Sequence, residues 1–195
     1  MTHLRPALVL VVLFTLLTGL AFPLGFTALA GIVFPAQAGG SLIVRNGMTV
    51  GSSLLGQTFT SDKYFQGRPS ATSKPDPADA SKTVPEPYNA GNSGGSNAGP
   101  TSKALIDRVT EDMGKAGAKP VPGDAVTTSA SGLDPHISPA NAARQVARVA
   151  TARSMTPAQV ETLLAANTSG RLLGLIGEPR VDVLALNLAL DAAKP

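Results

Sequence analysis

The chain has 195 residues with a formal net charge of +3, and it contains no cysteine and no tryptophan. The lack of cysteine excludes disulfides, thiolate catalysis and cysteine-ligated metals. Basic residues are scattered among acidic ones and aromatic residues make up only 4% of the chain, so no base-stacking surface is expected and nucleic acid is not a predicted partner.

Residues 6–44 contain no charged side chain, and most of this stretch is apolar. A run of about 20 such residues is long enough to cross a bilayer as an α-helix, because the helix satisfies its own backbone hydrogen bonds. The sequence therefore predicts a transmembrane helix at residues 7–29, in contact with membrane lipid. A cleaved signal peptide is the alternative, because Ala36-Gln37-Ala38 has the small-x-small pattern of a cleavage site and Pro23 could shorten the apolar core.

The distribution of basic residues predicts the orientation of this helix. Arg5 precedes it, and the next Lys or Arg is Arg45. Basic residues favour the cytoplasmic side. We therefore expect a cytoplasmic N-terminus at residues 1–6, a transmembrane helix at 7–29, a connector at 30–38 and a periplasmic soluble domain at 39–195. No second apolar run of this length follows, so a single pass is predicted.

The predicted fold class is α+β: one N-terminal transmembrane helix, then a single periplasmic mixed α/β domain with long irregular loops. Short strands are expected at residues 42–44 and 54–55, and the aromatic residues that follow are expected to fill the core. Prolines and glycines argue against regular structure over 69–100, which is either a flexible insert or a turn-rich loop packed on the core.

Four helices and one more strand are expected after residue 100. Helical spacing of apolar residues predicts a helix at 102–115. A second helix is expected at 138–153, capped by Ser138, with Ala143, Val146, Ala147 and Ala150 as its apolar stripe. Thr156 and Gln159 form a capping-box pattern for a third helix. A buried strand at 181–184 and a terminal helix at 186–193 complete the expected elements.

Residues 131–138 hold the best local cluster of reactive side chains. Asp134, His136 and Ser138 alternate there, and such a set could in principle form a hydrolase triad. The same residues equally suit a turn followed by a helix cap. A metal site needs three or four ligands, and His136 is the only histidine after the apolar stretch, so no metal is expected. The glycine-rich run at 91–99 lacks the GK[ST] ending of a phosphate-binding loop.

Several long phrases closely resemble the C subunits of Kdp-type potassium-transporting ATPases. They are GQTFTSDKYFQGRPSA at 56–71, YNAGNSGGSNAGPTS at 88–102, PVPGDAVTTSASGLDPHISPANAARQVARVATAR at 120–153 and GEPRVDVLALNLALD at 177–191. The resemblance covers nearly the whole chain in order. It implies a non-catalytic accessory subunit of an ATP-driven, high-affinity potassium uptake complex in the bacterial inner membrane, needed for assembly and stability. A membrane-tethered periplasmic hydrolase using Asp134, His136 and Ser138 is the alternative.

The resemblance also implies partners and cofactors. The partners are a channel-like potassium-translocating subunit, a catalytic P-type ATPase subunit and a small single-helix subunit. ATP, Mg and potassium belong to the complex, and no cofactor is expected on this chain. The family is further described as a catalytic chaperone that raises the ATP affinity of the ATPase subunit. No catalytic residue is carried over; the phrases supply candidates for structure or partner contact: Gln57, Tyr64, Phe65, Arg68, Asn89, Ser96, Asn97, Asp134, Gln145 and Arg148.

Two finer expectations accompany this resemblance. Family phrases often carry Asn where this chain has Asp182, which places an asparagine-dependent role there in doubt. The loop at 88–102 is rich in oxygen donors, which suit alkali cations. We therefore hypothesise that the exterior domain borders the outer entrance for potassium.

Overall fold

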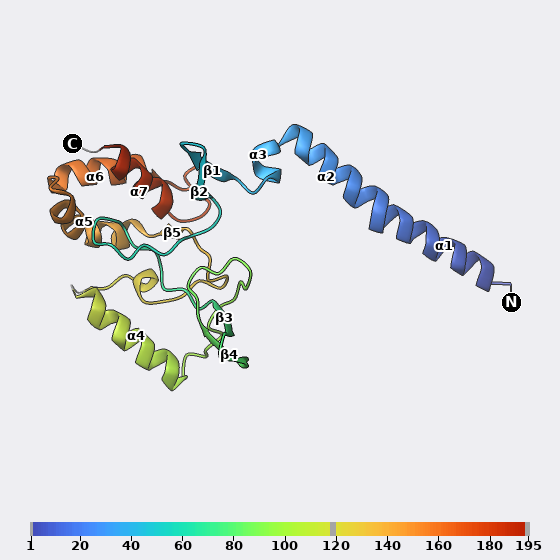
Figure 1. Ribbon diagram of the computed structural model, residues 1–195, viewed down its shortest axis with the longest axis horizontal. Coiled ribbons are helices and arrows are strands. Elements are labelled where there is room, and N and C mark those ends of the chain that lie inside the picture. The colour runs from blue at the N-terminus through green and yellow to red at the C-terminus, as the bar shows by residue number, and fades with distance from the viewer. Residues whose placement is uncertain (1, 118–119, 194–195) are drawn as a thin grey trace. The chain divides into compact units, whose positions relative to one another are not determined.

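The computed structural model describes residues 2–117 and 120–193. The chain divides into two compact units, Met1–Ser52 and Ser53–Pro195, and each is described by itself (Figure 1). The first unit holds a long helix and a β-hairpin. The second holds helices and short strands, which confirms the α+β class.

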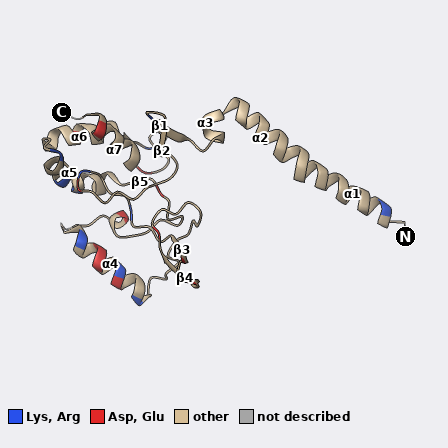
Figure 2. Cartoon of the chain, viewed as in Figure 1, with Lys and Arg blue, Asp and Glu red and all other residues tan. Residues whose placement is uncertain are grey.

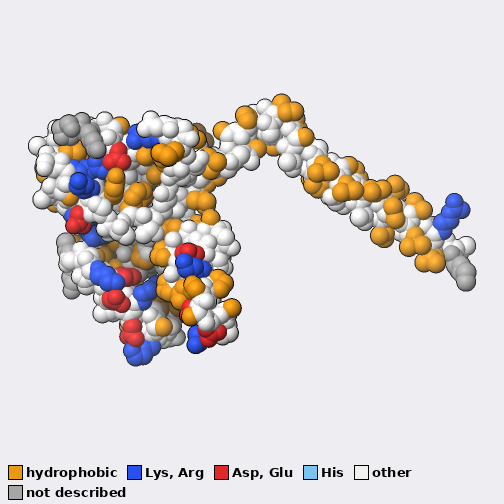
Figure 3. All heavy atoms as spheres, in the orientation of Figure 1, with side chains coloured by type: hydrophobic (Ala, Val, Ile, Leu, Met, Phe, Trp, Pro, Cys, Tyr) orange, Lys and Arg blue, Asp and Glu red, His pale blue; other side chains and the backbone are white. Residues whose placement is uncertain are grey.

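The long helix of the first unit runs without a break from Leu4 to Val33. It consists of α1 (Leu4–Leu16), a π-helical turn (Leu17–Ala21) and α2 (Phe22–Val33). Its length of 30 residues corresponds to about 45 Å, more than the roughly 30 Å of bilayer hydrocarbon. Its surface is apolar along its length, and only its N-terminal end carries a basic side chain (Figures 2 and 3). Among the described residues, it is the one helix long and apolar enough to cross a membrane.

The π-helical turn has a local cause in Pro23. Proline has no N–H to donate, and its ring collides with the carbonyl four residues earlier in a regular helix. The wider turn relieves this collision, and the Phe22 N–H donates to the Leu17 carbonyl oxygen five residues back. Pro23 therefore widens the helix without ending it.

A short helix and a hairpin complete the first unit. After α3 (Pro35–Ala38), strand β1 (Leu42–Arg45) pairs antiparallel with β2 (Met48–Ser52). Asn46 and Gly47 make the two-residue turn with φ of 50° and 77°, the left-handed conformation that favours Asn-Gly. The strand expected at 42–44 is confirmed. The second strand was wrongly predicted at 54–55, because the turn residues Asn46 and Gly47 require an immediate partner.

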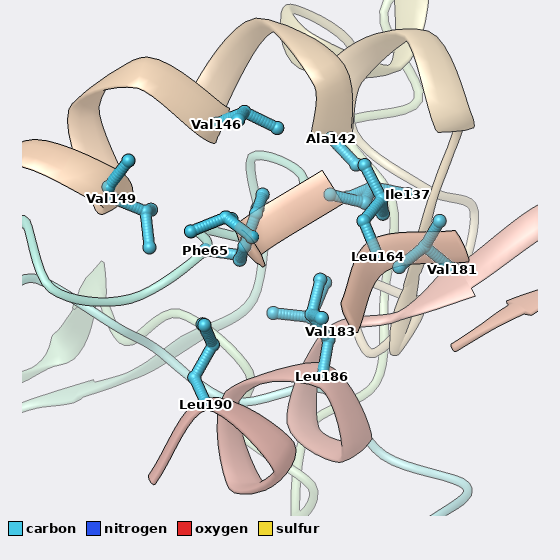
Figure 4. Packing of buried hydrophobic residues seen from close by; sticks show 12 residues of the cluster. Phe65, Ile137, Ala142, Val146, Val149, Leu164, Val181, Val183, Leu186 and Leu190 are labelled. Atoms are coloured by element: carbon cyan, nitrogen blue, oxygen red, sulfur yellow. The ribbon is translucent and has the colours of Figure 1, made fainter. Parts of the chain in front are cut away.

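The core of the second unit lies between three helices and a small sheet. The helices are α5 (Pro139–Arg153), α6 (Pro157–Ala166) and α7 (Val183–Ala192). Strands β5 (His136–Ile137), β7 (Arg180–Asp182) and β6 (Thr168–Ser169) form an antiparallel sheet in the order β5-β7-β6. Figure 4 shows Phe65 among side chains from α5, the sheet and α7, and its side chain has no exposed surface. The expectation that Phe65 fills the core is confirmed.

The predicted helix caps are present. The Ser138 hydroxyl accepts the Asn141 N–H, and Thr156 with Gln159 forms a complete capping box. The predicted apolar stripe of α5 is partly wrong, because Ala143 and Ala147 are exposed. The buried face instead holds two polar side chains beside the apolar ones: Asn141, Ala142, Gln145, Val146, Val149 and Ala150.

The boundary between the last strand and α7 also differs from the prediction. Strand β7 ends at Asp182, and α7 begins at Val183 instead of residue 186. The Asp182 carboxylate accepts the Ala185 N–H at 2.9 Å and so starts the helix. Asn is as good as Asp at this position, so the difference from the family phrases preserves the capping role.

The segment 69–100 contains regular structure that the sequence did not predict. Strand β3 (Ser73–Asp76) pairs antiparallel with β4 (Asp79–Pro85). Proline is excluded from central strands, but a two-stranded hairpin has two free edges on which its missing N–H costs little. The expectation of no regular structure was therefore wrong for 73–85.

The helix expected at 102–115 is confirmed as α4 (Lys103–Ala116). It ends at Gly117, which has a φ of 76° that suits glycine. None of its side chains is fully buried, and Ile106 is 54% exposed. A single turn of 3₁₀ helix (Gly123–Ala125) follows before β5.

Candidate functional site

Residues 62–66, called the clamped segment here, are held by side chains instead of by a neighbouring strand. The Asn187 side chain accepts the Phe65 N–H at 2.8 Å and donates to the Phe65 carbonyl oxygen at 2.9 Å. Gln145 does the same for Gln66, at 2.8 Å and 3.0 Å. Each amide thereby reproduces the two hydrogen bonds that a paired strand would make. Asn187 and Gln145 are 1% and 3% exposed, so their primary contacts are internal.

Two arginines of α5 extend this clamp. Arg148 donates to the carbonyl oxygens of Asp62 and Tyr64 at 2.9 Å and 3.0 Å. Burial lowers the pKa of Arg148 from its usual value, and the Asp62 charge opposes that change. Arg153 donates to the Lys63 carbonyl oxygen at 2.6 Å, and its guanidinium lies 4.9 Å from the centre of the Tyr64 ring. The arginines therefore fix the backbone of the clamped segment.

Asp191 connects α7 to the same cluster. Its carboxylate accepts from Arg153 Nη2 at 2.8 Å and from the Tyr64 hydroxyl at 3.2 Å. The Arg153 side chain is 8% exposed and the Asp191 side chain 31% exposed, so the arginine end of this ion pair is shielded from water more than in a surface pair. Tyr64, Phe65, Gln145 and Arg148, four of the residues singled out in the sequence, thus meet in one network.

Arg68 and Asp134 form a second node. Arg68 Nη1 lies 3.0 Å from Asp134 Oδ2, and Arg68 also donates to the Thr128 carbonyl oxygen. Burial alone would raise the pKa of Asp134, but hydrogen bonds from His136 and Arg68 outweigh it, so the pKa lies below its usual 3.8. Asp134 also accepts the His136 backbone N–H at 2.9 Å. The Arg68–Asp134 ion pair thus joins the chain just after the clamped segment to the residues just before β5.

Tyr88 packs into the backbone of two neighbouring segments. Its hydroxyl donates to the Arg68 carbonyl oxygen at 2.8 Å. A Cβ at Gly56 would overlap the Tyr88 ring, and a Cβ at Gly67 would overlap the Tyr88 hydroxyl oxygen. Burial, with a smaller contribution from the Asp134 charge, raises the pKa of Tyr88 to about 12. Gln57 is half-buried and lines, with Tyr88, a hollow of about 390 Å³. The tyrosine anchors the loop that follows it.

The loop after Tyr88 is packed and turn-rich, which decides between the two alternatives left by its sequence. Asn89 Nδ2 donates to the Ser73 carbonyl oxygen at 2.9 Å, and Asn89 Oδ1 accepts the Gly91 N–H. The Gly94 N–H donates to the Ser131 carbonyl oxygen at 2.9 Å. Ser96 and Asn97, by contrast, are exposed. Asn89 is therefore a structural residue, while Ser96 and Asn97 present their side chains to solvent.

Of the residues proposed for a hydrolase triad, Asp134 and His136 contact each other, but Ser138 has other partners. Ser138 Oγ donates to Asp124 Oδ1 at 2.8 Å and accepts the Asn141 N–H. His136 Nδ1 lies 3.5 Å from Asp134 Oδ1. Within the described residues, 2–117 and 120–193, no hydrogen bond joins Ser138 to His136. This arrangement fits a helix cap, because the serine proton is directed at a carboxylate and not at a base that could remove it.

Sequence reasoning missed several side chains of these networks, among them Asp124, Arg153, Asn187 and Asp191. Asp124 binds the Ser138 and Asn141 side chains from the 3₁₀ turn Gly123–Ala125, and its position beside them follows only from the fold. Asn187 gave a usable signal, because a lone amide within the apolar run 183–190 implies a buried hydrogen-bonded role.

These features define a class: a protein with one candidate membrane-spanning helix and an α+β domain whose polar groups mainly hold its own backbone. The comparison with protein families then identifies the group. The chain belongs to the KdpC family, described as "K+-transporting ATPase, c chain", which matches residues 4–192. The resemblance noted in its phrases is thereby confirmed.

Curated relatives match the chain over nearly its whole length. A potassium-transporting ATPase KdpC subunit from Rhodopseudomonas palustris (strain BisB18) is 62% identical, covering 98% of each chain. Another from Methylobacterium nodulans is 63% identical, covering 97% of this chain and 96% of the relative. One from Bradyrhizobium diazoefficiens is 62% identical, covering 98% of this chain and 97% of the relative.

Proposed function

We propose that this chain is the non-catalytic accessory subunit of an ATP-driven, high-affinity potassium uptake complex, needed for assembly and stability. The observation that carries this proposal is the similarity, over nearly the full length, to subunits named for a potassium-transporting ATPase. The polar networks are consistent with it, because their side chains are occupied by backbone groups. The partners are a channel-like subunit, a P-type ATPase subunit and a small single-helix subunit.

Co-purification from membranes tests this proposal directly. The full chain, tagged and expressed with the rest of its operon, should bring down a P-type ATPase and a channel-like protein. The rival hydrolase predicts instead that the full chain alone cleaves an ester or peptide substrate and that His136→Ala abolishes the activity. A chain that hydrolyses such substrates and binds no ATPase would refute the accessory role.

The proposal includes a topology in the bacterial inner membrane, with the N-terminus in the cytoplasm and the second unit in the periplasm. Its support is the position of Arg5 before an uncharged helix. N-terminal sequencing of the membrane-extracted chain should begin at Met1 or Thr2. A mature chain beginning at Gly39 would mean that the helix is a cleaved signal peptide.

In this proposal ATP, Mg and potassium are bound by the partner subunits. A role as catalytic chaperone, raising the ATP affinity of the ATPase subunit, then requires an effect carried through the membrane helices, because ATP is cytoplasmic. Deleting the second unit while keeping residues 1–52 separates the two contributions. If the helix carries the effect, the apparent ATP affinity of the complex stays unchanged in this truncation.

The exterior unit is further proposed to border the potassium entrance through the loop at 88–102. Because Asn89 holds the loop together, the informative variants are Ser96→Ala and Asn97→Ala, whose side chains are exposed. Asn89→Ala serves as the structural comparison. A change in the potassium dependence of ATP hydrolysis at normal complex yield supports the entrance role, and an unchanged dependence in both exposed variants refutes it.

A further inference from the structure

A polar hollow of about 320 Å³ lies between the end of α4, the middle of α5 and the clamped segment. Its walls include three basic side chains, Lys115, Arg144 and Arg148, and one acidic side chain, Asp62. A second hollow of about 270 Å³ shares Lys115 and Arg144 with it. A hollow lined mainly by one sign of charge concentrates ions of the opposite sign.

Two of the three basic side chains have carboxylate partners that are open to water. Lys115 Nζ lies 2.7 Å from Glu111 Oε1, and the two side chains are 67% and 66% exposed. Arg148 Nη1 lies 3.4 Å from Asp62 Oδ1, and the Asp62 side chain is 74% exposed. Exposed ion pairs of this kind contribute little free energy, because water screens them. Lys115 can therefore leave Glu111 for another anion at small cost.

Arg144 has only neutral partners. Its Nη1 donates to the Ala116 carbonyl oxygen at 3.2 Å, and its Nη2 donates to Asn141 Oδ1 at 3.0 Å. Within residues 2–117 and 120–193 no carboxylate pairs with Arg144, and its buried Nε has no hydrogen-bond partner. The dipole of α4, which ends at Ala116, offsets part of the arginine charge. The remaining positive charge of this half-buried side chain favours an anionic ligand.

Both arginines are fixed in place before any ligand binds. Arg148 Nη2 donates to Gln145 Oε1 at 2.8 Å and to the Tyr64 carbonyl oxygen at 3.0 Å, while Asn141 holds Arg144. Burial is the main cause of the lowered pKa of Arg148, and the charge of Arg144 lowers it further. The two positive charges therefore repel each other, and an anion in the hollow that both line would relieve this repulsion. Donors fixed in advance also lose little entropy on binding.

We propose that this hollow binds a tetrahedral oxyanion of the phosphate type, either free phosphate or the phosphate of an anionic lipid headgroup. After its bonds to Ala116 and Asn141, the Arg144 guanidinium keeps one further N–H on each terminal nitrogen. Lys115 adds an ammonium group from a different helix. Donors that approach from two helices suit the oxygens of a tetrahedral anion better than the single face of a planar carboxylate. The bound anion ties α4, which has no fully buried side chain, to α5.

Thermal unfolding of the full chain in detergent, followed by the tyrosine band of near-ultraviolet circular dichroism, tests this proposal. Phosphate at ten times its dissociation constant should raise the Tm by roughly 3–6 °C relative to chloride at equal ionic strength, because the ligand binds only the folded state. Arg144→Gln should lose this rise and Lys115→Gln should weaken it. Arg171→Gln is the matched control and should keep the full rise, because Arg171 is ion-paired with Glu178 and lines neither hollow.

Lipid nanodiscs distinguish the two sources of the anion. If the hollow takes free phosphate, added phosphate raises the Tm equally in phosphatidylcholine and phosphatidylglycerol discs. If it takes a headgroup, phosphatidylglycerol itself raises the Tm of the wild type but not of Arg144→Gln, and added phosphate then has less effect. The chain alone suffices for both measurements, so their outcome does not depend on the accessory role.

Two results overturn the proposal. One is a wild-type chain that responds no more to phosphate than to chloride, in detergent and in both kinds of disc. The other is a full phosphate response in Arg144→Gln. If Arg144→Gln fails to fold, because it also loses its bond to the Ala116 carbonyl oxygen, Lys115→Gln decides. The exposed Lys115 side chain can be changed without loss of packing, and a full response in that variant overturns the site.

Discussion

Replacing Asn187 with alanine should destabilise the second unit more than the small change in side-chain volume suggests. The amide makes two hydrogen bonds to Phe65, at 2.8 Å and 2.9 Å, in a position that is 1% exposed. Its removal leaves one buried N–H and one buried carbonyl without partners, and each such group costs about 1–3 kcal/mol. We expect a loss of about 3 kcal/mol in the free energy of unfolding. That corresponds to a fall of roughly 6–12 °C in Tm for a domain of this size.

The assay can report on the second unit alone. The chain has two tyrosines and no tryptophan, and both tyrosines, Tyr64 and Tyr88, lie in that unit. The tyrosine band of the near-ultraviolet circular dichroism spectrum of the full chain in detergent therefore follows the unfolding of this unit without a contribution from the long helix, whose aromatic residues are all phenylalanines. Asn92→Ala is the matched control, because this amide donates to the Ser73 carbonyl oxygen from an exposed position. If Asn187→Ala unfolds within about 1 kcal/mol of Asn92→Ala, side-chain clamping is not what holds residues 62–66.

Three further changes test other parts of the structure. Gly56→Ala should lower the free energy of unfolding by roughly 2 kcal/mol, because the new Cβ would overlap the Tyr88 ring. Gly94→Ala is the control and should cost far less, because the space around Gly94 is open. Equal Tm values for the two variants would disprove the close packing at Gly56. In the folded chain the pKa of Tyr88 is raised to about 12 from its ordinary value of 10. The neutral Tyr88 hydroxyl therefore contributes fully to folding stability below pH 10, and this contribution is lost as the pH rises toward 12. Tyr88→Phe should flatten this alkaline loss of stability when denaturant unfolding is measured at several pH values. Asp182→Asn should keep the cap of α7 within about 0.5 kcal/mol while Asp182→Ala loses about 1 kcal/mol, and equal losses in urea unfolding would argue against capping.

Local signals in the sequence were sufficient to predict that the helices exist and where α5 and α6 start, but not where α7 starts. Ser138 and Thr156 cap helices as their spacing indicates, since a cap depends only on residues within one turn. The long apolar helix was likewise evident from composition. The hairpin at 73–85 was not, because proline rules apply to central strands and the sequence does not reveal that these strands are edges.

The candidate site was predictable only as a set of residues. Gln145 and Arg148 were singled out by resemblance, and neither belongs to the apolar stripe predicted for their helix. They are drawn inward because the clamped segment brings unpaired backbone groups against α5, and those groups need polar partners. These backbone groups belong to a segment about 80 residues earlier in the chain, so the periodicity of α5 alone cannot predict them. Whether these residues also contact partner subunits stays a prediction.

The clamp also sets the order in which the chain can mature. Phe65 and Asn187 are separated by 122 positions, so the backbone at residue 65 lacks its partner until α7 has been synthesised. The apolar helix at the start of the chain is complete long before then and can enter the membrane first. If the helix stays in the membrane as proposed, the second unit closes its core while tethered, with Phe65 and the face of α5 open to water in the interval. During that interval the unfinished unit is most vulnerable to proteases and to aggregation, and a slowed synthesis of α7 would prolong it.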